Sequence, residues 1–462
     1  MKETIAAISS GMTKSGIGII RISGPESRSI AEKIFYKKSG AGIKLDIPSH
    51  IYYGFIKNVS RETSDEVLVL NMPAPHSFTG EDTVEIDCHG GILMMRRVLE
   101  AVLDAGARMA EPGEFTKRAF INGRIDLSQA EAVIDVINAK NDNAIRASVG
   151  QLKGELSECI KDLRSIILNK TAYIESALDD PEHYSLDGLS DELEEETEGL
   201  LETINFLIRS YDRGKIISDG INTVIIGKPN AGKSSLLNNI LGEERAIVSQ
   251  IPGTTRDIIS ETCSIGNVTL NIIDTAGIRE TADTVEKIGV KKALEYADKA
   301  DLILCVIDSS LPFDNSDKDI FNYIKNTDAK VLFLLNKSDL DMCISEEDIK
   351  EAASRPAADI LTISAKEGSG IERLYEYIDK MFSSGDLKFN DEMVISSIRH
   401  KQLLEKAKEA LEGLRSSIET GLPEDFYTVD LMEAYGALGE IIGEEVDEDL
   451  INEIFSKFCM GK

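Results

Sequence analysis

The stretch NTVIIGKPNAGKSSLLNNIL, residues 222–241, sets the architecture of the middle of this chain. A β-branched run leads into GKPNAGKSS, which fits the pattern G-x-x-x-x-G-K-[ST], and an apolar run with helical spacing follows. Glycines in such a loop let backbone N–H groups approach phosphates, while Lys233 supplies a cation and Ser234 can ligate Mg²⁺. The nucleotide contacts predicted here are Asn230, Ala231, Gly232, Lys233, Ser234 and Ser235.

Three further motifs follow, each at the end of a β-branched or apolar run. DTAG begins at Asp274, which can reach Mg²⁺ through water, and ends at Gly277, whose N–H can sense a γ-phosphate. NKSD ends at Asp339, which can accept the ring N–H and the exocyclic amine of guanine; adenine offers no such pair. SAK, residues 364–366, can donate a main-chain N–H to the base. The motifs predict GTP as the nucleotide, with contacts from Asp274, Thr275, Ala276, Gly277, Asn336, Lys337, Asp339, Ser364, Ala365 and Lys366.

Between the first two motifs lies PGTTRD, a polar loop in which Thr255 is predicted to close over Mg²⁺. Ile278 follows DTAG and cannot orient a water as the glutamine of many signalling GTPases does. Another group must therefore accelerate hydrolysis, and Arg256 and Arg279 are local candidates.

Strand and helix patterns alternate around these motifs, as a parallel sheet with crossover helices requires. Before them, runs such as GIGIIRIS, HIYYGFI, EVLVLNM and TVEIDCHG predict a mixed α+β domain, and long 3.6-periodic segments flank the G domain on both sides. We predict a nucleotide domain inserted into a helical domain whose two parts pack together. The expected ranges are 1–117 for the N-terminal domain, 118–215 and 381–462 for the helical domain, and 216–380 for an α/β P-loop G domain.

Composition restricts the class of protein. With 42% hydrophobic and 29% charged residues, and no apolar run near the roughly 20 residues of a membrane span, we expect a cytoplasmic protein without membrane contact. The net charge of -30 disfavours non-specific nucleic-acid binding, so any RNA contact must be local. Residues 179–202 contain eleven Asp and Glu and no Lys or Arg; this stretch is a solvated helical face or a docking face for a basic partner.

Six cysteines occur without a CxxC pair, which argues against a disulfide framework and a zinc site. We expect five of them to be buried or half-buried thiols. Cys459, near the end in FCMGK, stands apart from these.

Taken in order with GIGIIRISGP, PGEFTKRAFINGRIDLSQAEAV and FCMGK, the motifs resemble the MnmE (TrmE) family of tRNA-modification GTPases over essentially the full length. The resemblance implies a folate-binding N-terminal domain that forms a homodimer, a central helical domain and an inserted Ras-like G domain. It also implies an FAD-dependent partner, MnmG. With it the family adds an aminomethyl or carboxymethylaminomethyl group to carbon 5 of the wobble uridine of certain tRNAs, using 5-formyltetrahydrofolate or a related one-carbon tetrahydrofolate.

By motif position, Arg21, Glu85, Arg124 and Lys462 match the folate contacts of that family. The chemistry permits this, because the cations suit folate carboxylates and the pterin oxygen while Glu85 can bind pterin N–H groups. Without the resemblance, the two arginines would be read as surface or ion-pair residues. Cys459 matches the family's C-terminal cysteine, a nucleophile in the transfer chemistry if a cation lowers its pKa.

The resemblance also assigns the hydrolysis machinery. Glu286 matches an acidic residue that orients the attacking water, although by itself it is an ordinary acid in the first turn of a helix. Asn230 matches the P-loop ligand of a K⁺ ion that replaces an arginine finger and promotes pairing of two G domains. The predicted K⁺ site is completed by Ser249, Ile251 and Thr254, and Ser249 and Thr254 also contact the nucleotide. The chain departs from the usual pattern at Ser249 and Gln250, where Thr and Asp are common, and in LDDPEHY near Asp179.

Two other classes of function compete with a tRNA-modifying enzyme. A ribosome-assembly or signalling GTPase switch would be favoured by an added RNA-binding module or a second G domain, and the sequence suggests neither. A scaffold with a vestigial G domain is disfavoured because Lys233, Ser234, Asp274 and Asp339 are intact.

Overall fold

The computed structural model describes residues 3–57, 62–242, 260–265, 268–273, 300–325, 327, 329–383, 393–444, 446–458 and 461. The chain divides into two compact units. The first comprises Met1–Ile137, Ser148–Asn205 and Gln402–Lys462, and the second comprises Asn138–Ala147 and Phe206–Lys401. None of the described helices has the length and apolarity needed to cross a membrane.

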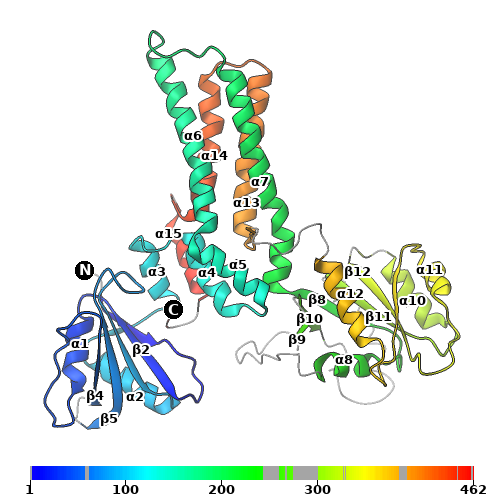
Figure 1. Ribbon diagram of the computed structural model, residues 1–462, viewed down its shortest axis with the longest axis horizontal. Helices are drawn as coiled ribbons and strands as arrows, with labels where there is room; N and C mark the ends of the chain where they lie inside the picture. The colour runs from blue at the N-terminus through cyan, green and yellow to red at the C-terminus, as the bar shows by residue number, and fades with distance from the viewer. Residues whose placement is uncertain are drawn as a thin grey trace. The chain divides into compact units, whose positions relative to one another are not determined.

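The N-terminal part of the first unit is built on a sheet that, in the described chain, has seven strands in the order β3-β4-β5-β6-β2-β1-β7 (Figure 1). The strands are β1 (Ile5–Ile8), β2 (Ile17–Ser23), β3 (Phe35–Tyr36), β4 (His50–Lys57), β5 (Thr63–Met72), β6 (Thr83–His89) and β7 (Arg108–Met109). Two helices, α1 (Ser27–Ile34) and α2 (Ile92–Asp104), pack on the sheet and share its apolar core. Successive side chains of a strand point to opposite faces. Since Ile20, Ile22, Val84 and Ile86 face that core, Arg21 and Glu85 lie on the other face.

The helical part of the same unit joins segments that are far apart in the sequence. Its helices are α3 (Glu114–Ile121), α4 (Leu127–Asn138), α5 (Asp142–Lys153), α6 (Glu155–Asp179), α7 (Leu189–Asp219), α13 (Ile398–Glu419), α14 (Asp425–Ile442) and α15 (Glu448–Ser456). The first half of α5, the last turns of α7 and the first turn of α13 belong to the second unit. Leu127 of α4 shares a core with Phe455 of α15, and the Arg164 guanidinium of α6 lies 3.9 Å from the Tyr435 ring centroid of α14. The predicted packing of the two helical parts is confirmed.

The acidic stretch 179–202 forms the end of α6, the following connection and the first turns of α7. Lys170 Nζ of α6 pairs with Glu192 Oε1 at 2.6 Å and Glu196 Oε1 at 3.0 Å. Part of the acidic surplus is therefore neutralised against a neighbouring helix.

The second unit contains a doubly covered sheet. Within the described residues its order is β13-β12-β11-β8-β10-β9, with β8 (Ile221–Ile226), β9 (Ser260–Ile265), β10 (Val268–Ile273), β11 (Leu302–Asp308), β12 (Lys330–Asn336) and β13 (Asp359–Thr362). All these strands pair in parallel except β9, which pairs antiparallel with β10 and was not predicted. The covering helices are α8 (Lys233–Gly242) and α12 (Ile371–Ser383) on one core, and α10 (Asn315–Ile324) and α11 (Glu346–Ala353) on the other.

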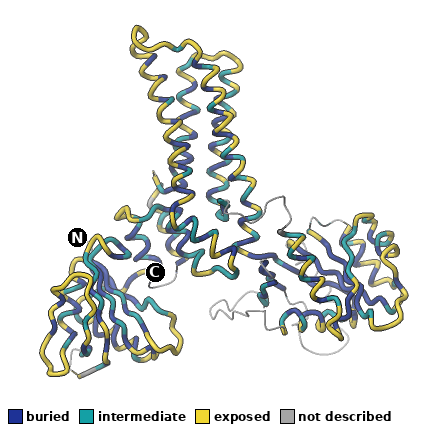
Figure 2. The backbone as a smooth tube through the Cα atoms, in the orientation of Figure 1, coloured by how far each residue is buried: buried dark blue, intermediate teal, exposed yellow. Residues whose placement is uncertain are grey.

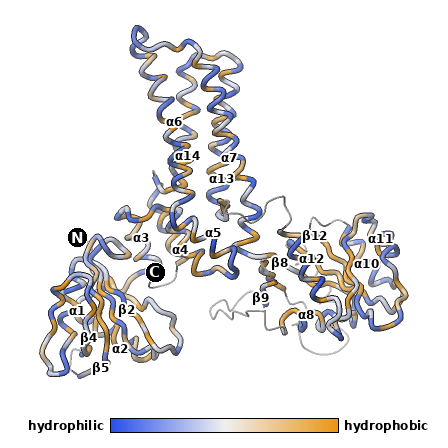
Figure 3. Tube along the Cα trace, viewed as in Figure 1, coloured by the Kyte–Doolittle hydropathy of each residue, from blue (hydrophilic) through white to orange (hydrophobic). Residues whose placement is uncertain are grey.

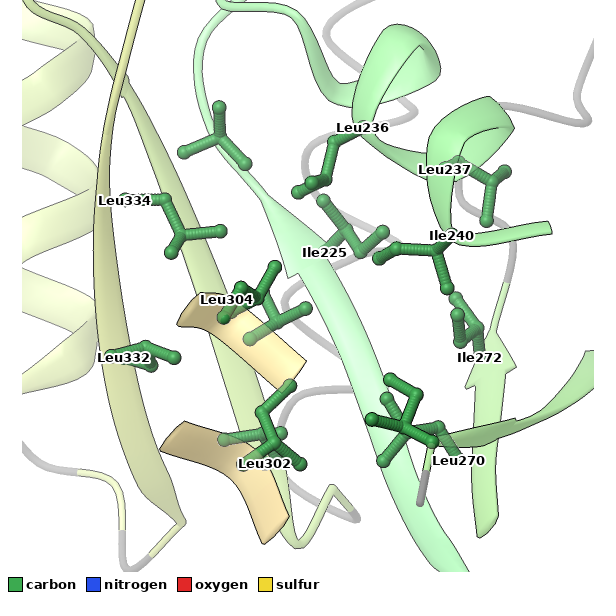
Figure 4. Packing of buried hydrophobic residues seen from close by; sticks show 14 of the residues in the cluster. Ile225, Leu236, Leu237, Ile240, Leu270, Ile272, Leu302, Leu304, Leu332 and Leu334 are labelled. Carbon is green, nitrogen blue, oxygen red and sulfur yellow. The ribbon is translucent and has the colours of Figure 1, made fainter. Parts of the chain in front are cut away.

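Burial and hydropathy follow this layered plan. The central strands β8, β10, β11 and β12 are buried and apolar along most of their length, as a parallel sheet covered on both faces requires (Figures 2 and 3). Figure 4 shows Ile225, Leu304 and Leu334 of the sheet packed beneath Leu236 and Ile240 of α8. The chain therefore has a multidomain fold: an α+β N-terminal domain, a helical domain and an inserted P-loop α/β domain. The exact domain boundaries stay a prediction.

The cysteines correct one expectation. Cys88, Cys263 and Cys305 are buried and Cys159 is half-buried, but Cys343 is exposed, so the prediction of a buried or half-buried thiol is wrong there. Cys343 lies in the polar connection between β12 and α11, where no core covers it. Burial raises the pKa of Cys88 and of Cys263 to about 12, which keeps both as neutral thiols at neutral pH.

Candidate functional site

The first candidate site is the loop between β8 and α8. The backbone of Gly232 has φ +100°, and a Cβ atom there would overlap Asn336 Nδ2. Only glycine combines that left-handed conformation with such close approach. The loop therefore packs directly against the last residue of β12, and the predicted strand, loop and helix are all present.

Lys233 and the start of α8 form the cationic part of this loop. Lys233 Nζ donates hydrogen bonds to the carbonyl oxygens of Gly227 and Lys228, both at 2.9 Å. Ser234 and Ser235 lie exposed in the first turn of α8. A helix N-terminus and an ammonium group together attract an anion, so the arrangement suits a polyphosphate.

Asn336 connects the phosphate-binding loop to the SAK motif. Its side chain is 2% exposed; Nδ2 donates to Ala231 O at 2.7 Å, and Oδ1 accepts from Ala365 N at 2.8 Å. Both the NH2 group and the oxygen of this amide are thus hydrogen-bonded, and their two bonds join the C-terminal ends of β8, β12 and β13. Ligands bind at this edge of an open parallel sheet.

Asp339 is placed to recognise a base at the same edge. Its exposed carboxylate accepts a hydrogen bond from Ser364 Oγ at 2.6 Å, and that bond lowers the pKa of Asp339. The group is therefore charged at neutral pH. A charged, exposed carboxylate can accept two N–H groups of guanine.

Two ion pairs, each with a buried carboxylate, hold the loops of this site, and neither was predicted. Lys337 has φ +67° and its Nζ lies 2.6 Å from the buried Asp308 Oδ2. Burial is the largest single influence and raises the pKa of Asp308, but the hydrogen bonds from Lys337 and Ser310 and the charge of Lys337 together outweigh it, and the pKa is lowered. Lys228, 7% exposed, pairs with Asp317 Oδ2 at 2.9 Å. Both partners are distant in sequence, so a motif search had no signal for them.

The second candidate site lies on the face of the N-terminal sheet opposite the core shared with α1 and α2. Arg21 of β2 is paired in register with Glu85 of β6, and Arg21 Nε lies 2.7 Å from Glu85 Oε1 with both side chains 16% exposed. The Arg21 guanidinium lies 5.2 Å from the Phe78 ring centroid and 5.7 Å from that of Phe115. The Arg124 guanidinium lies 5.2 Å from the same Phe78 ring and donates to Phe78 O at 3.0 Å. The structure thus brings Arg21, Glu85 and Arg124 together around Phe78, a residue that the sequence did not single out.

The loop that carries Phe78 is fixed by α3 and the residues after it. Asn122 Nδ2 donates to Thr79 O at 2.7 Å, and the buried Arg118 contacts Glu81 Oε2 at 3.0 Å and Glu114 Oε1 at 2.9 Å. These contacts hold the ring between the two arginines. The resulting site offers two guanidinium groups, one carboxylate and aromatic rings, a combination that suits a planar heterocycle with attached carboxylates.

Several predicted residues lie outside the described part of the chain. They are Ser249, Ile251, Thr254, Thr255, Arg256, Asp274, Thr275, Ala276, Gly277, Arg279, Glu286, Cys459 and Lys462.

Comparison with known proteins gives consistent matches over the whole chain. Residues 127–459 match the family described as MnmE helical domain, and residues 4–124 match the family described as GTP-binding protein TrmE N-terminus. The chain is 55% identical over 461 residues to the tRNA modification GTPase MnmE of Lachnoclostridium phytofermentans, covering 100% of this chain and 99% of the relative. It is 47% identical over 464 residues to the protein of that name from Acetivibrio thermocellus, with the same coverage. Among solved structures, Era from Aquifex aeolicus matches 41% of this chain and 66% of its own at 29% identity, with a TM-score of 0.27.

Proposed function

Because this chain belongs to the MnmE family of tRNA modification GTPases, we propose that it modifies carbon 5 of the wobble uridine of certain tRNAs. It hydrolyses GTP, and in our proposal it works in the cytoplasm as a homodimer with an FAD-dependent partner of the MnmG type. The group added is aminomethyl or carboxymethylaminomethyl. The observation that carries this proposal is the convergence of Arg21, Glu85 and Arg124 on Phe78 in a chain that also holds a nucleotide site.

The face of the N-terminal sheet that carries Arg21 and Glu85 is the proposed folate site. Arg21 is neutralised by Glu85, whereas Arg124 is exposed and its hydrogen bond goes to a neutral carbonyl. The cluster therefore carries a net positive charge, which favours the carboxylates of a folate. Glu85 can accept pterin N–H groups, and Phe78 offers a ring face. A bound one-carbon tetrahydrofolate would supply the carbon that is transferred; the residues of this chain bind and orient it.

The loop at the start of α8 is the proposed triphosphate site. Lys233 neutralises the β- and γ-phosphates, and the exposed Ser234 hydroxyl has the chemistry and position of a Mg²⁺ ligand. Magnesium would offset charge on the phosphates. Asp339, held by Ser364, accepts the N–H groups of guanine and selects GTP over ATP.

The proposed accelerator of hydrolysis is a K⁺ ion at Asn230. This residue has φ +61° and an exposed side chain at the loop, so its amide oxygen is available to a cation. The ion would supply the positive charge that an arginine finger gives other GTPases. Ordering of the switch loop would then favour pairing of two G domains, with Glu286 placing the attacking water.

Nucleoside analysis of tRNA from cells that lack this protein tests the proposed modification. We expect the modified wobble uridines to disappear, to return with the parent protein, and not to return with Arg21→Ala. Unchanged wobble uridines would contradict the proposal and point to the alternative, a ribosome-assembly or signalling switch.

The cation dependence of turnover tests the proposed accelerator. GTP hydrolysis should be much faster in K⁺ than in Na⁺ at matched ionic strength, since a finger contributes roughly 10³ to 10⁵ in related enzymes. Asn230→Ala should erase the difference, and Glu286→Ala should slow hydrolysis with little loss of nucleotide binding. Equal rates in the two salts would assign the role to Arg256 or Arg279.

A further inference from the structure

Asp87 is a carboxyl group beside the Arg21–Glu85 pair that has no hydrogen-bond or ion-pair partner within the described residues. Side chains two apart on a strand share a face, so Asp87 of β6 lies on the same face as Glu85, about 7 Å further along the strand. Its Oδ1 atom is buried and accepts no hydrogen bond from that part of the chain. Buried polar atoms of native proteins are nearly always hydrogen-bonded, so this carboxyl group requires an explanation.

The neighbours of Asp87 on this face cannot supply the hydrogen bond. In register, Asp87 is opposite Ile19 of β2 and Leu68 of β5, and such cross-strand side chains lie about 5 Å apart. Both neighbours are apolar, and Arg21 donates its Nε–H to Glu85. Burial, followed by the charge of Glu85, raises the pKa of the Asp87 carboxyl group. A donor for it must therefore come from a molecule that covers this face.

The side chains around the two carboxyl groups favour one class of ligand. Leu70 of β5 is opposite Glu85, and Leu68, which is 42% exposed, is opposite Asp87. Asp87 is itself half-buried, so a ligand on this face can reach its carboxyl group. A small anion is disfavoured, because it would meet two carboxylates. A flat heterocycle that covers the leucines and carries N–H groups on two of its edges satisfies both requirements.

The pterin of a folate has two such edges. In every oxidation state its pyrimidine edge carries N3–H and the 2-amino group, and together these match a single carboxylate. The ring atom N8 differs, because it bears a hydrogen in 7,8-dihydropterins and tetrahydropterins but has a lone pair in an oxidised pterin. A carboxylate that faces N8 therefore accepts a hydrogen bond from a reduced ring and repels an oxidised one.

We propose that Asp87 selects reduced folates at this site, by accepting a hydrogen bond from the pterin N8–H while Glu85 accepts those of the pyrimidine edge. The inference rests on the proposed function, because it takes a folate as the ligand. The bound ring would also cover the exposed Leu68. Asp87 is thus a specificity-determining residue, in addition to the residues that hold the folate.

Equilibrium binding of two folates that differ at N8 tests the inference. 7,8-Dihydrofolate has an N8–H, folic acid has none, and both carry the same glutamate tail. In calorimetric titrations the parent should bind 7,8-dihydrofolate about tenfold more tightly or better, since a hydrogen bond to a charged group contributes at least that much. Asp87→Asn should bring the ratio of affinities near one, because an amide can turn its oxygen to N8–H or its NH2 group to the lone pair.

Glu66→Gln is the matched control. Glu66 is a carboxylate on the same face of β5, but it already accepts a hydrogen bond from the Tyr53 hydroxyl. Its variant should keep the parental ratio of affinities. Both variants should also keep the GTP turnover of the parent and its elution volume in gel filtration. An equal fall of the ratio in Glu66→Gln and Asp87→Asn would overturn the inference, because the charge of the whole face would then be the cause.

The same titrations separate this inference from the proposed function. If the parent binds 5-formyltetrahydrofolate but does not distinguish 7,8-dihydrofolate from folic acid, Asp87 does not select the ring and the proposed function survives. The same conclusion holds if Asp87→Asn keeps the parental ratio. If that variant also elutes as a smaller species, the carboxyl group belongs to a contact between two copies of the chain. If the parent binds none of the three folates, the proposed function and the inference both fail.

Discussion

The nucleotide site and the Arg21 site are built in different ways. The nucleotide site uses loops at the ends of neighbouring parallel strands, and much of its contact surface is backbone, held by the amide of Asn336. The Arg21 site uses side chains from β2, β6 and two separate loops, which meet around Phe78. A backbone site depends on local conformation and is encoded in short motifs. A site made of side chains depends on register and on long-range packing, and its members are scattered.

The largest effect is expected at Gly232, where a substitution tests whether the nucleotide site depends on its backbone conformation. Gly232→Ala places a Cβ on Asn336 Nδ2 in a left-handed conformation, so the loop must move. We expect GTP affinity to fall on the order of 100-fold, the equivalent of about 2 to 3 kcal/mol of strain and lost contacts. Titration with a fluorescent guanine nucleotide measures this.

Gly242→Ala is the control for this variant, because it ends the same helix and a Cβ there meets nothing within 4 Å. It should bind nucleotide like the parent, and folate binding should be unaffected in both variants. A Gly232→Ala protein with parental GTP affinity would show that the site does not depend on its backbone.

The next largest effect is expected from Arg21→Ala. This change leaves the Glu85 carboxylate without its ion pair to Arg21 and removes one cation from the Phe78 ring. Binding of 5-formyltetrahydrofolate should weaken about tenfold or more, since truncating one half of a shielded charge pair typically costs over 1.4 kcal/mol. The control variant Lys44→Ala removes the ion pair between the exposed Lys44 and Glu32, and it should leave folate affinity unchanged. Similar folate affinity in Arg21→Ala and Lys44→Ala would disprove the site.

A smaller effect is expected from Asp308→Asn, which removes a buried carboxylate that supports the NKSD loop. At pH 7 the free energy of unfolding of the variant should be about 1 to 2 kcal/mol lower than that of the parent, because Lys337 loses a charged acceptor. The pKa of Asp308 is lowered below its ordinary 3.8, so this stabilisation is present above that value and is lost as the pH falls through the folded pKa. Denaturant unfolding at pH 7 and in acid should therefore show a difference that shrinks with acidity. A difference that is constant with pH would exclude the charge as its cause.

The smallest effect is expected from Phe78→Leu. The ring lies against the Arg21 and Arg124 guanidinium groups, and its loss should cost about 0.5 to 1 kcal/mol of binding free energy, so folate affinity should fall roughly 2- to 5-fold. Calorimetric titration can resolve this. A loss larger than that of Arg21→Ala would make stacking, rather than charge, the main source of affinity.

The difference between the sites also explains what could be predicted from the sequence. The long strands around the motifs were predicted correctly because their apolar runs are continuous and end at recognisable loops. The short strands β1, β3 and β7, of two to four residues, carry too little periodicity to be found. β9, with the sequence SETCSI, is a polar edge strand without an apolar run.

The two sites also differ in how far local sequence motifs predict their residues. Lys233 and Asp339 follow from local motifs and lie where such motifs place them. The pairing of Arg21 with Glu85 needs the register of β2 and β6, and the position of Phe78 needs the packing of α3 on a loop. No sequence pattern contains that information, so the family resemblance supplied what local reasoning lacked.

Asn336 has one more consequence, for how the two ends of a nucleotide communicate. Its amide bonds to both the loop proposed to contact the phosphates and the loop proposed to contact the base, so ordering either loop favours the order of the other. Thermodynamic linkage is reciprocal, and the free energy that the phosphates lend to base recognition equals the free energy that the base lends to phosphate binding. Discrimination among purines then depends on both loops together. For a nucleotide with the wrong base, the binding of its phosphates should be weaker as well.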